Sequence, residues 1–159
     1  MQSIEEIEQE DDATAMFRRI LVPVDFSAVS HRAVYAALEF QRVYGSQLCV
    51  FHAAHGGGND QFLAGLGSPT STGDVADTSA VRRFLNNIAP GRVDAVECDA
   101  TMDDDYVASI QSKTRKWGAT MIILSHEPHT SLLRTHSEKI MKSLEVPVLL
   151  LPPSSPTKA

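Results

Sequence analysis

The sequence of 159 residues is poor in cysteine and lacks any apolar run near the roughly 20 residues that a membrane-spanning helix needs. Its N-terminus also lacks the basic and apolar regions of a signal peptide. The spacing of its two cysteines, Cys49 and Cys98, does not indicate a disulfide. These absences predict a cytoplasmic protein without a membrane partner, in which both thiols are small buried apolar groups.

An excess of positive charge is missing as well. The formal net charge is −6, but six acidic residues between Glu5 and Asp12 precede the first basic residue, which leaves 14 acidic and 14 basic residues from Phe17 onward. Proteins that bind nucleic acids need a clear cationic excess to contact phosphates. The neutral body of the chain therefore argues against nucleic acid and against an anionic membrane surface as partners.

Both ends of the chain lack the patterns of a folded core. Residues 1–16 combine the acidic block with scattered apolar residues, which predicts a disordered or loosely helical tail. Residues 153–159 are expected to form a second tail, because the prolines there cannot continue a helix or a strand ladder. The domain is expected between the two tails, over residues 17–152.

Apolar runs of strand length alternate with helical patterns across this domain. Strands are predicted over residues 18–25, 46–54, 92–99, 119–125 and 146–152, and helices over residues 27–45, 78–89, 103–118 and 135–145. Near-continuous apolar strands followed by helices indicate a parallel sheet that is covered on both faces. The predicted fold class is a doubly wound α/β fold.

Two of the helices have clear end signals. Ser27 is expected to be the N-cap of helix 27–45, and Gly45 is expected to end it. Asp103, Asp104 and Asp105 lie in the first turn of helix 103–118, whose last turn is basic. This charge order complements the helix dipole and explains the three acids without a cation site.

The connection over residues 55–77 breaks the pattern of short loops and holds most of the glycines of the chain. A loop of this length in a compact domain is usually functional or disordered. Two interpretations stay open, a mobile surface excursion and a lid over the carboxyl edge of the sheet.

Segments at the two ends of the domain resemble a known family. Ile20 to Ser27 reads ILVPVDFS and Val146 to Leu151 reads VPVLLL, and both segments resemble universal stress proteins. The match runs from Arg18 to Pro152, with every element in family order. The resemblance implies a five-stranded parallel sheet of order 3-2-1-4-5, the adenine nucleotide alpha hydrolase-like fold.

The same resemblance implies a homodimer that forms through the last strand, Val146 to Leu151. Physical reasoning agrees, because an apolar strand at the edge of a sheet invites pairing unless something covers it. The alternative is an edge that the proline-rich C-terminal tail protects.

A glycine-rich turn is missing where members of that family that bind ATP have one after strand four. The family pattern is G-x-x-G, nine further residues and then G-[ST]. Here Ser125 and Pro128 replace the first two glycines, and Arg134-Thr135 stands for the last pair after a shorter interval. Glycine lets backbone N–H groups approach phosphate oxygens, and proline has no N–H. Since no glycine occurs after Gly118, we predict that the chain does not bind ATP and needs no cofactor.

Part of the nucleotide pocket nevertheless persists. The resemblance places Pro23, Val24 and Asp25 where nucleotide-binding relatives contact base and ribose, at the carboxyl end of strand one. Arg134 offers a cation to phosphate, and Thr135 offers a hydroxyl. Binding of ATP or AMP is therefore the alternative, and its candidate residues are Pro23, Val24, Asp25, Ser125, His126, Arg134 and Thr135. A second role is open for Asp25, which would simply brace the turn into the first helix.

Histidines gather at the same edge of the predicted sheet. His126, His129 and His136 surround the turn after strand four, and His52 and His55 end strand two. An H-x-x-H pair with a third histidine can ligate zinc or copper, but this spacing is loose and no cysteine is near. We predict no metal site and expect solvated or locally hydrogen-bonded imidazoles.

The function that the sequence favours is that of a non-catalytic, dimeric stress-response protein of the universal stress type. It would act in the cytoplasm through contacts with a protein partner that the sequence does not identify. The alternative is a module that binds ATP or AMP, with at most slow hydrolysis.

Overall fold

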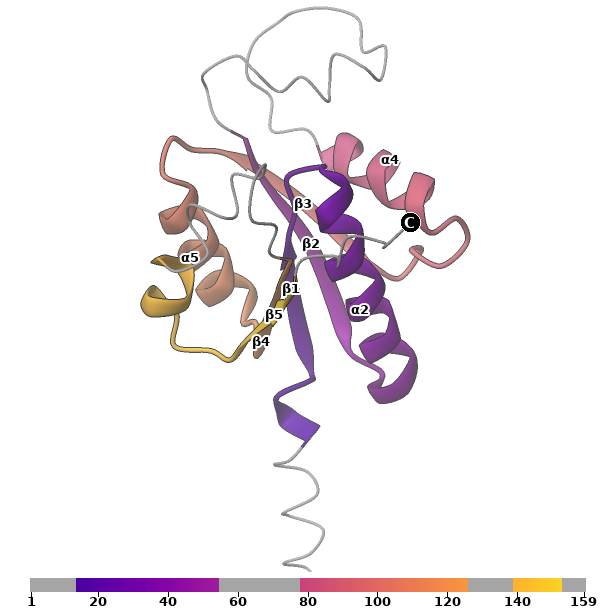
Figure 1. Ribbon diagram of the computed structural model, residues 1–159, viewed down its shortest axis with the longest axis horizontal. Coiled ribbons are helices and arrows are strands. Elements are labelled where there is room, and N and C mark those ends of the chain that lie inside the picture. Colours follow the sequence, from indigo (N-terminus) through magenta and orange to yellow (C-terminus); the bar gives the residue numbers. More distant parts are fainter. Residues whose placement is uncertain (1–13, 55–77, 126–138, 153–159) are drawn as a thin grey trace, which may run out of the picture.

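The computed structural model describes residues 14–54, 78–125 and 139–152, which build a five-stranded sheet between helices (Figure 1). The strands are β1 (Arg19–Pro23), β2 (Gln47–Ala54), β3 (Glu97–Met102), β4 (Met121–Ser125) and β5 (Val148–Leu151), and the helices are α2 (Ala28–Tyr44), α4 (Thr78–Ile88) and α5 (Tyr106–Trp117). Residues 139–143 are also helical. The strand order is β3-β2-β1-β4-β5 with parallel pairing throughout, which confirms the predicted fold class.

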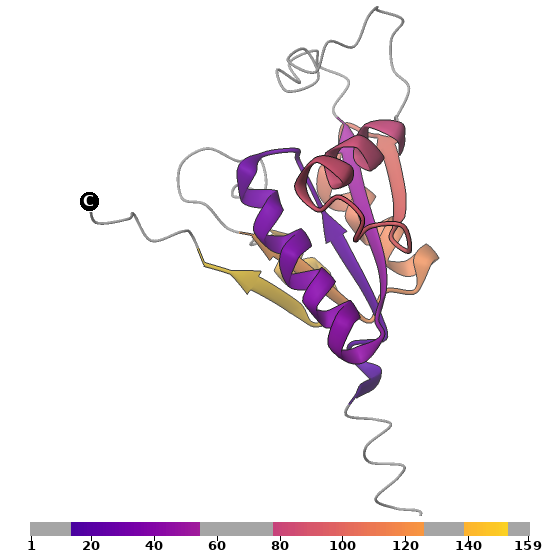
Figure 2. The ribbon, with the colours of Figure 1, turned by 90° about the vertical axis from the view of Figure 1, so that its right-hand side faces the viewer.

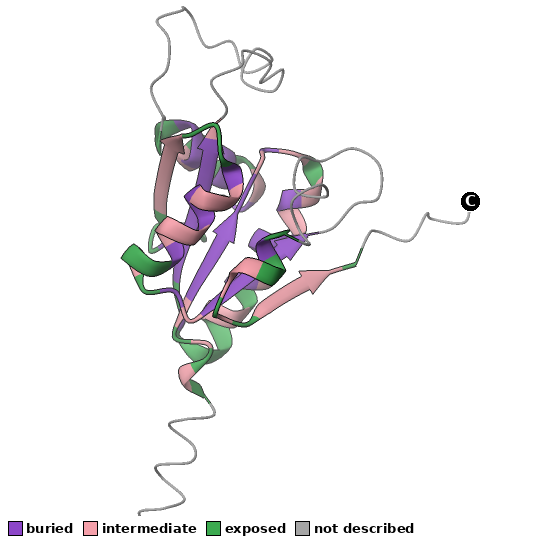
Figure 3. Cartoon of the chain, turned by 90° about the vertical axis from the view of Figure 1, so that its left-hand side faces the viewer, coloured by how far each residue is buried: buried purple, intermediate pink, exposed green. Residues whose placement is uncertain are grey.

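Helices cover both faces of the sheet. α2 and α4 lie on one face, and α5 lies on the other with the helical residues 139–143 (Figures 1 and 2). Because successive side chains of a strand point to opposite faces, β1 contributes Ile20 and Val22 to the core under α2 and α4, and Leu21 to the core under α5. The central strands are buried almost throughout, whereas the edge strands β3 and β5 are only partly buried (Figure 3).

The third strand lies further along the chain than the sequence predicts, because β3 begins at Glu97 and not at residue 92. The apolar residues that suggested a strand, Val93 and Val96, are buried from a turn that packs on the core under α4. Arg82 of α4 holds this turn, since its guanidinium donates hydrogen bonds to the carbonyl of Val93 at 2.7 Å and to that of Val96 at 2.6 Å. A packed turn therefore produced the apolar pattern of a strand.

The predicted start of one helix also needs correction. α5 begins at Tyr106, so the acids precede the helix instead of lying in its first turn, and Asp105 is the N-cap, whose carboxylate accepts from the Ala108 N–H at 3.0 Å. Ser27 is at the N-cap position of α2 but makes no side-chain cap hydrogen bond. The predicted end at Gly45 is confirmed, because this glycine has the left-handed φ of 68° that only glycine adopts easily.

Several sequence predictions fall on residues outside the described ones. These are most of the two tails, the long connection over residues 55–77 and the start of the last helix, of which the structure describes residues 139–143. None of the helices in the described part of the chain is long and apolar enough to cross a membrane.

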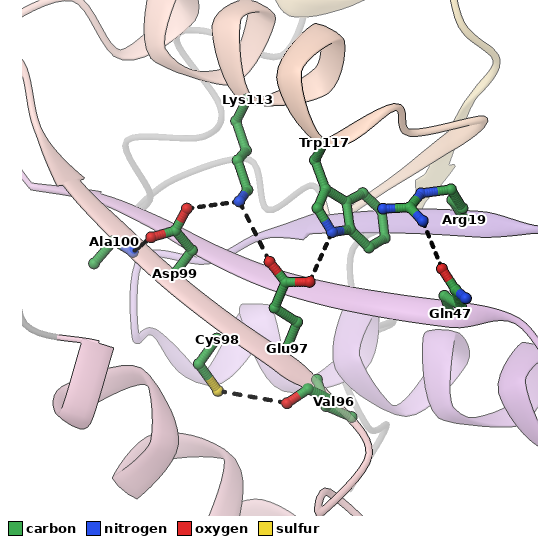
Figure 4. Close-up of polar contacts among 9 residues, drawn as sticks. All are labelled: Arg19, Gln47, Val96, Glu97, Cys98, Asp99, Ala100, Lys113 and Trp117. Atoms are coloured by element: carbon green, nitrogen blue, oxygen red, sulfur yellow. Dashed lines mark hydrogen bonds and ion pairs between the residues drawn. The ribbon is translucent and has the colours of Figure 1, made fainter.

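The two edges of the sheet differ in chemistry. At β3, the Asp99 carboxylate accepts from the Ala100 N–H at 2.9 Å, and Lys113 of α5 reaches across to Asp99 at 2.6 Å and to Glu97 at 3.7 Å (Figure 4). Glu97 also accepts from the Trp117 indole N–H at 2.8 Å. At the opposite edge, β5 consists of the four apolar residues VLLL, and all four are partly exposed. Charges at an edge strand oppose pairing with another chain, and apolar residues do not.

The two cysteines lie on neighbouring strands but on opposite faces of the sheet. Cys49 is fully buried under α5, and Cys98 packs at the edge of the core under α4, where it is only partly buried. Both are free thiols, which agrees with the absence of a predicted disulfide. Burial raises the pKa of the Cys49 thiol to about 12 and also raises that of Cys98.

We therefore expect the two thiols to differ in reactivity, since the thiolate is the reactive form. In the native protein, an aromatic disulfide reagent should modify Cys98 slowly and leave Cys49 unmodified until the chain is unfolded. The measurement is the number of thiols titrated over time with and without denaturant, and Cys98→Ser should remove the native-state reaction. Equal native rates for both thiols would contradict this assignment.

Candidate functional site

The turn after β1 is tied to β2 by the backbone of Val24. The Val24 N–H donates to the Phe51 carbonyl at 2.9 Å, and the Val24 carbonyl accepts from His52 Nδ1 at 2.9 Å. Pro23 and Val24 are both buried. Two of the three residues that the resemblance places against base and ribose therefore lie at the buried carboxyl end of the central strand.

Asp25 connects this turn to α2. Its Oδ1 atom accepts from the Ser27 N–H at 3.0 Å, from the Ser27 hydroxyl and from the Ser30 hydroxyl at 2.8 Å. The Asp25 N–H in turn donates to the Ser30 hydroxyl oxygen at 3.2 Å. One carboxylate oxygen thus braces the entry to α2, which is the second of the two roles that the sequence left open for Asp25.

Phe26 occupies an unusual conformation at the centre of this turn. Its φ of 62° is in the left-handed region, which is unfavourable for residues other than glycine. The ring is fully buried, and its centroid lies 4.1 Å from that of His52 and 5.3 Å from that of Phe84. Packing of the ring holds the backbone in this conformation.

His52, one of the histidines that were weighed as metal ligands and expected instead to be solvated or locally hydrogen-bonded, belongs to this packing. Its ring is buried between Phe26 and the Val24 carbonyl. The alternation of β2 predicts this orientation. Phe51 and Ala53 face α5, so the side chain of His52 between them points to the opposite face of the sheet. His55, His126, His129 and His136 lie outside the described residues. Among the residues that are described, no three potential ligands lie close enough together to hold a metal ion.

Ser125 ends β4, the strand next to β1. It is 1% exposed and pairs in register with Leu151, and its hydroxyl has no hydrogen-bond partner among the described residues. The carboxyl ends of β1 and β4 form the switch point of the sheet, because the chain crosses from one side of β1 to the other between them. The structure thus brings Pro23, Val24, Asp25 and Ser125 to the carboxyl ends of the two neighbouring strands β1 and β4. The other candidates, His126, Arg134 and Thr135, lie outside the described residues.

Tyr106 is a member of this site that the sequence did not reveal. It is the first residue of α5 and is 3% exposed. Burial raises the pKa of its phenol, and the negative charge of Asp25 raises this pKa further. The phenol is therefore neutral and lies near the β1 turn. No spacing in the sequence connects residue 106 with residue 25, because α5 follows β3 at the far edge of the sheet.

The arrangement is a hydrogen-bonding site of short polar side chains at the switch point, built from Asp25, Ser27, Ser30 and Ser125, with the phenol of Tyr106 close by. Its groups can hold a turn or a small polar ligand. The resolved hydrogen bonds of Asp25 serve the turn.

Comparison with solved structures finds the same fold in universal stress proteins. A protein of this family from Burkholderia pseudomallei has a TM-score of 0.60 at 20% identity, with 87% of this chain and 98% of that chain covered. A universal stress protein in complex with cAMP has a TM-score of 0.60 at 14% identity, over 84% of this chain and 95% of the other. One from Archaeoglobus fulgidus in complex with dAMP has a TM-score of 0.56 at 16% identity, over 85% and 98%.

Comparison with curated proteins finds no match. A family model described as the universal stress protein family matches residues 16–152, a range that contains all five strands. The resemblance seen in ILVPVDFS and VPVLLL is thus confirmed over the whole sheet, and the chain belongs to the universal stress protein family.

Proposed function

We propose that this chain is a non-catalytic, cytosolic stress-response protein that acts as a homodimer through protein contacts and does not use ATP. The observation that carries the proposal is the apolar edge at β5. Val148 and Leu150 pack against the core under α5, and Leu149 and Leu151 pack against the core under α2 and α4. All four side chains are partly exposed, so both cores continue to the outside of the molecule at this strand.

Pairing of β5 with β5 of a second copy would cover this surface. A two-fold axis would join the two strands through the backbone groups that face away from β4 and extend both cores across the interface. The opposite edge does not offer this, because Asp99, Glu97 and Lys113 place charges along β3. The asymmetry of the two edges supports β5 as the interface.

The β1 turn supports the part of the proposal that concerns ATP. Asp25 uses one carboxylate oxygen three times for the turn into α2, and Val24 uses its N–H and its carbonyl for contacts to β2. The sequence after β4 also lacks the glycines that would let backbone N–H groups surround phosphates. The free thiols Cys49 and Cys98 suit a reducing compartment.

Lysine on the β5 edge tests the dimer. We expect Leu149→Lys to weaken the dimer by a factor of about 100 or more, since burying an unpaired ammonium at an interface costs several kcal/mol. The measurement is sedimentation equilibrium over a range of protein concentrations. Thr101→Lys, which places the same charge on the opposite edge strand, is the matched control and should leave the dimer intact. A wild-type chain that stays monomeric at all concentrations would overturn the proposed interface.

Binding of an adenine nucleotide is the second candidate function. It is favoured by the universal stress proteins of the same fold that were solved with cAMP and with dAMP. In this chain the buried Ser125 hydroxyl, which has no partner among the described residues, is at the same edge as Asp25. A ligand there would satisfy this hydroxyl.

Thermal unfolding separates the two candidates. A ligand present at 100 times its Kd stabilises a protein by about 2.7 kcal/mol, which is several degrees in Tm for a chain of this size. With millimolar Mg-ATP, AMP or cAMP added separately, we expect no shift under the first proposal. A shift with AMP or cAMP alone would favour a nucleotide site without a triphosphate subsite, and a shift with Mg-ATP would overturn the first proposal on this point.

A further inference from the structure

The two faces of β3 are covered differently. α4 packs directly on one face of this strand, whereas on the other face α5 packs against the neighbouring strand β2. Glu97, Asp99 and Thr101 of β3 pair in register with Cys49, Phe51 and Ala53, which face α5. The side of β3 that faces α5 is therefore polar and stands beside the helix, not under it.

A cleft of about 280 Å³ lies between α5 and β3. Four α5 residues at positions i, i+3, i+4 and i+7, which share one face of the helix, line one wall: Ser109, Ser112, Lys113 and Lys116. Asp99, Thr101 and Asp103 line the opposite wall, and the buried ring of Phe51 lies between the walls. The lining is therefore mostly polar, in contrast to the mainly apolar lining of most small-molecule sites, and its one aromatic side chain lies at the base.

Ser109 indicates that the cleft is suited to a polar ligand. The residue is 4% exposed, and its hydroxyl has no hydrogen-bond partner among the described residues. A helical hydroxyl commonly bonds to the carbonyl four residues earlier, as Thr114 does with Ile110 at 2.6 Å on the same helix. Ser109 does not make this bond and lines the cleft instead. Because a buried hydroxyl without a partner is unfavourable, a ligand that bonds to it gains affinity.

The charges of the cleft are balanced. Asp99 and Asp103 face Lys113 and Lys116, and Lys113 is already paired with Asp99. Lys116 is exposed and forms no ion pair with any residue that the structure describes. A ligand with a large net charge would be repelled either by the two aspartates or by the two lysines. A ligand with many hydroxyl groups, each of which donates and accepts, matches carboxylates, ammonium groups and hydroxyls together.

We propose that this cleft binds a small neutral polyhydroxylated compound of about the size of a monosaccharide. Its hydroxyls would donate to Asp103 and Asp99 and accept from Lys116, and Ser109 would bond to a hydroxyl deep in the cleft. The C–H face of the ligand would rest on Phe51. This site is separate from the turn after β1, since it lies on the face of the edge strand β3 and not at the switch point between β1 and β4.

Backbone amide NMR tests the proposal with the complete chain. D-glucose, D-ribose and sodium phosphate are titrated separately into the ¹⁵N-labelled protein, and the amide shifts of Thr101, Ser109 and Lys116 are followed. We expect saturable shifts of these amides with at least one of the two sugars. Ser112→Tyr, which fills the cleft, should weaken this binding by at least about tenfold. Arg115→Tyr places the same ring on the same helix outside the cleft and should leave it unchanged.

The outcomes are distinct. Sugar shifts that Ser112→Tyr abolishes and Arg115→Tyr preserves, with unchanged Tm for both variants, support the site. Saturable shifts with phosphate but with neither sugar would overturn the neutral-ligand proposal and indicate an anion bound by Lys116. No saturable shift with any of the three compounds, or equal sugar affinity in Ser112→Tyr and wild type, would also overturn the proposal.

Discussion

Replacing Phe26 by alanine is expected to lower the free energy of unfolding by about 3–5 kcal/mol, the usual cost of removing a buried phenyl ring. Phe26 is 1% exposed and packs on His52 and Phe84, so its removal leaves a cavity beside the β1 turn. Chemical denaturation followed by circular dichroism measures this loss. The same substitution also keeps the left-handed φ of 62° that a side chain disfavours.

Glycine at the same position separates the packing of the ring from the strain of the backbone. In the middle of a helix or strand, a glycine variant is normally less stable than the alanine variant by about 0.5–1 kcal/mol. At Phe26 the order should reverse, with Phe26→Gly more stable than Phe26→Ala by about 1 kcal/mol, because glycine adopts positive φ without strain. Phe84 in α4 is the control, since it is also buried but helical, and there the alanine variant should be the more stable one. The normal order at both positions would show that the Phe26 backbone is unstrained.

The sheet was largely predictable from the sequence because its central strands are buried on both faces. Ile20 to Val24 and Met121 to Ser125 have almost no polar side chains, and a continuous apolar run of this length between helical patterns is typical of a parallel strand. The order of the strands depended on the resemblance of the chain to universal stress proteins. Apolar pattern alone does not specify which strand lies beside which.

The errors occurred where burial did not follow the pattern of an element. Val93 and Val96 are buried from a turn, and β3 itself begins with alternating acidic and small residues, Glu97 to Ala100, because it is an edge strand beside a polar cleft. The effect of the Asp25 charge on the pKa of Tyr106 involves residues that are distant in sequence, so no local rule predicts it. Pro23, Val24, Asp25 and Ser125 lie at the carboxyl ends of β1 and β4, but the sequence left open whether Asp25 faces a ligand or braces a turn.

Replacing Asp25 by alanine distinguishes those two roles. The turn then loses the acceptor for the Ser27 N–H, the Ser27 hydroxyl and the Ser30 hydroxyl. Hydrogen bonds to a charged group contribute about 1.5–3 kcal/mol each and are not additive within one cluster, so we expect a loss of about 2–3 kcal/mol in the free energy of unfolding. Asp25→Asn keeps a carbonyl oxygen at the same place and should lose about 1 kcal/mol.

The relative stabilities of the two variants show whether Asp25 braces the turn or is held for a ligand. If Asp25 braces the turn, the free energy of unfolding depends on the acceptor oxygen. Asp25→Ala should then be clearly less stable than Asp25→Asn, and Asp25→Asn should be close to the wild type. If the carboxylate is held ready for a ligand, its charge is unfavourable in the free protein, and both variants should unfold at or above the wild-type denaturant concentration, as substitutions of strained functional groups do. The second result, together with a Tm shift on addition of AMP that both variants lose, would assign Asp25 to nucleotide binding.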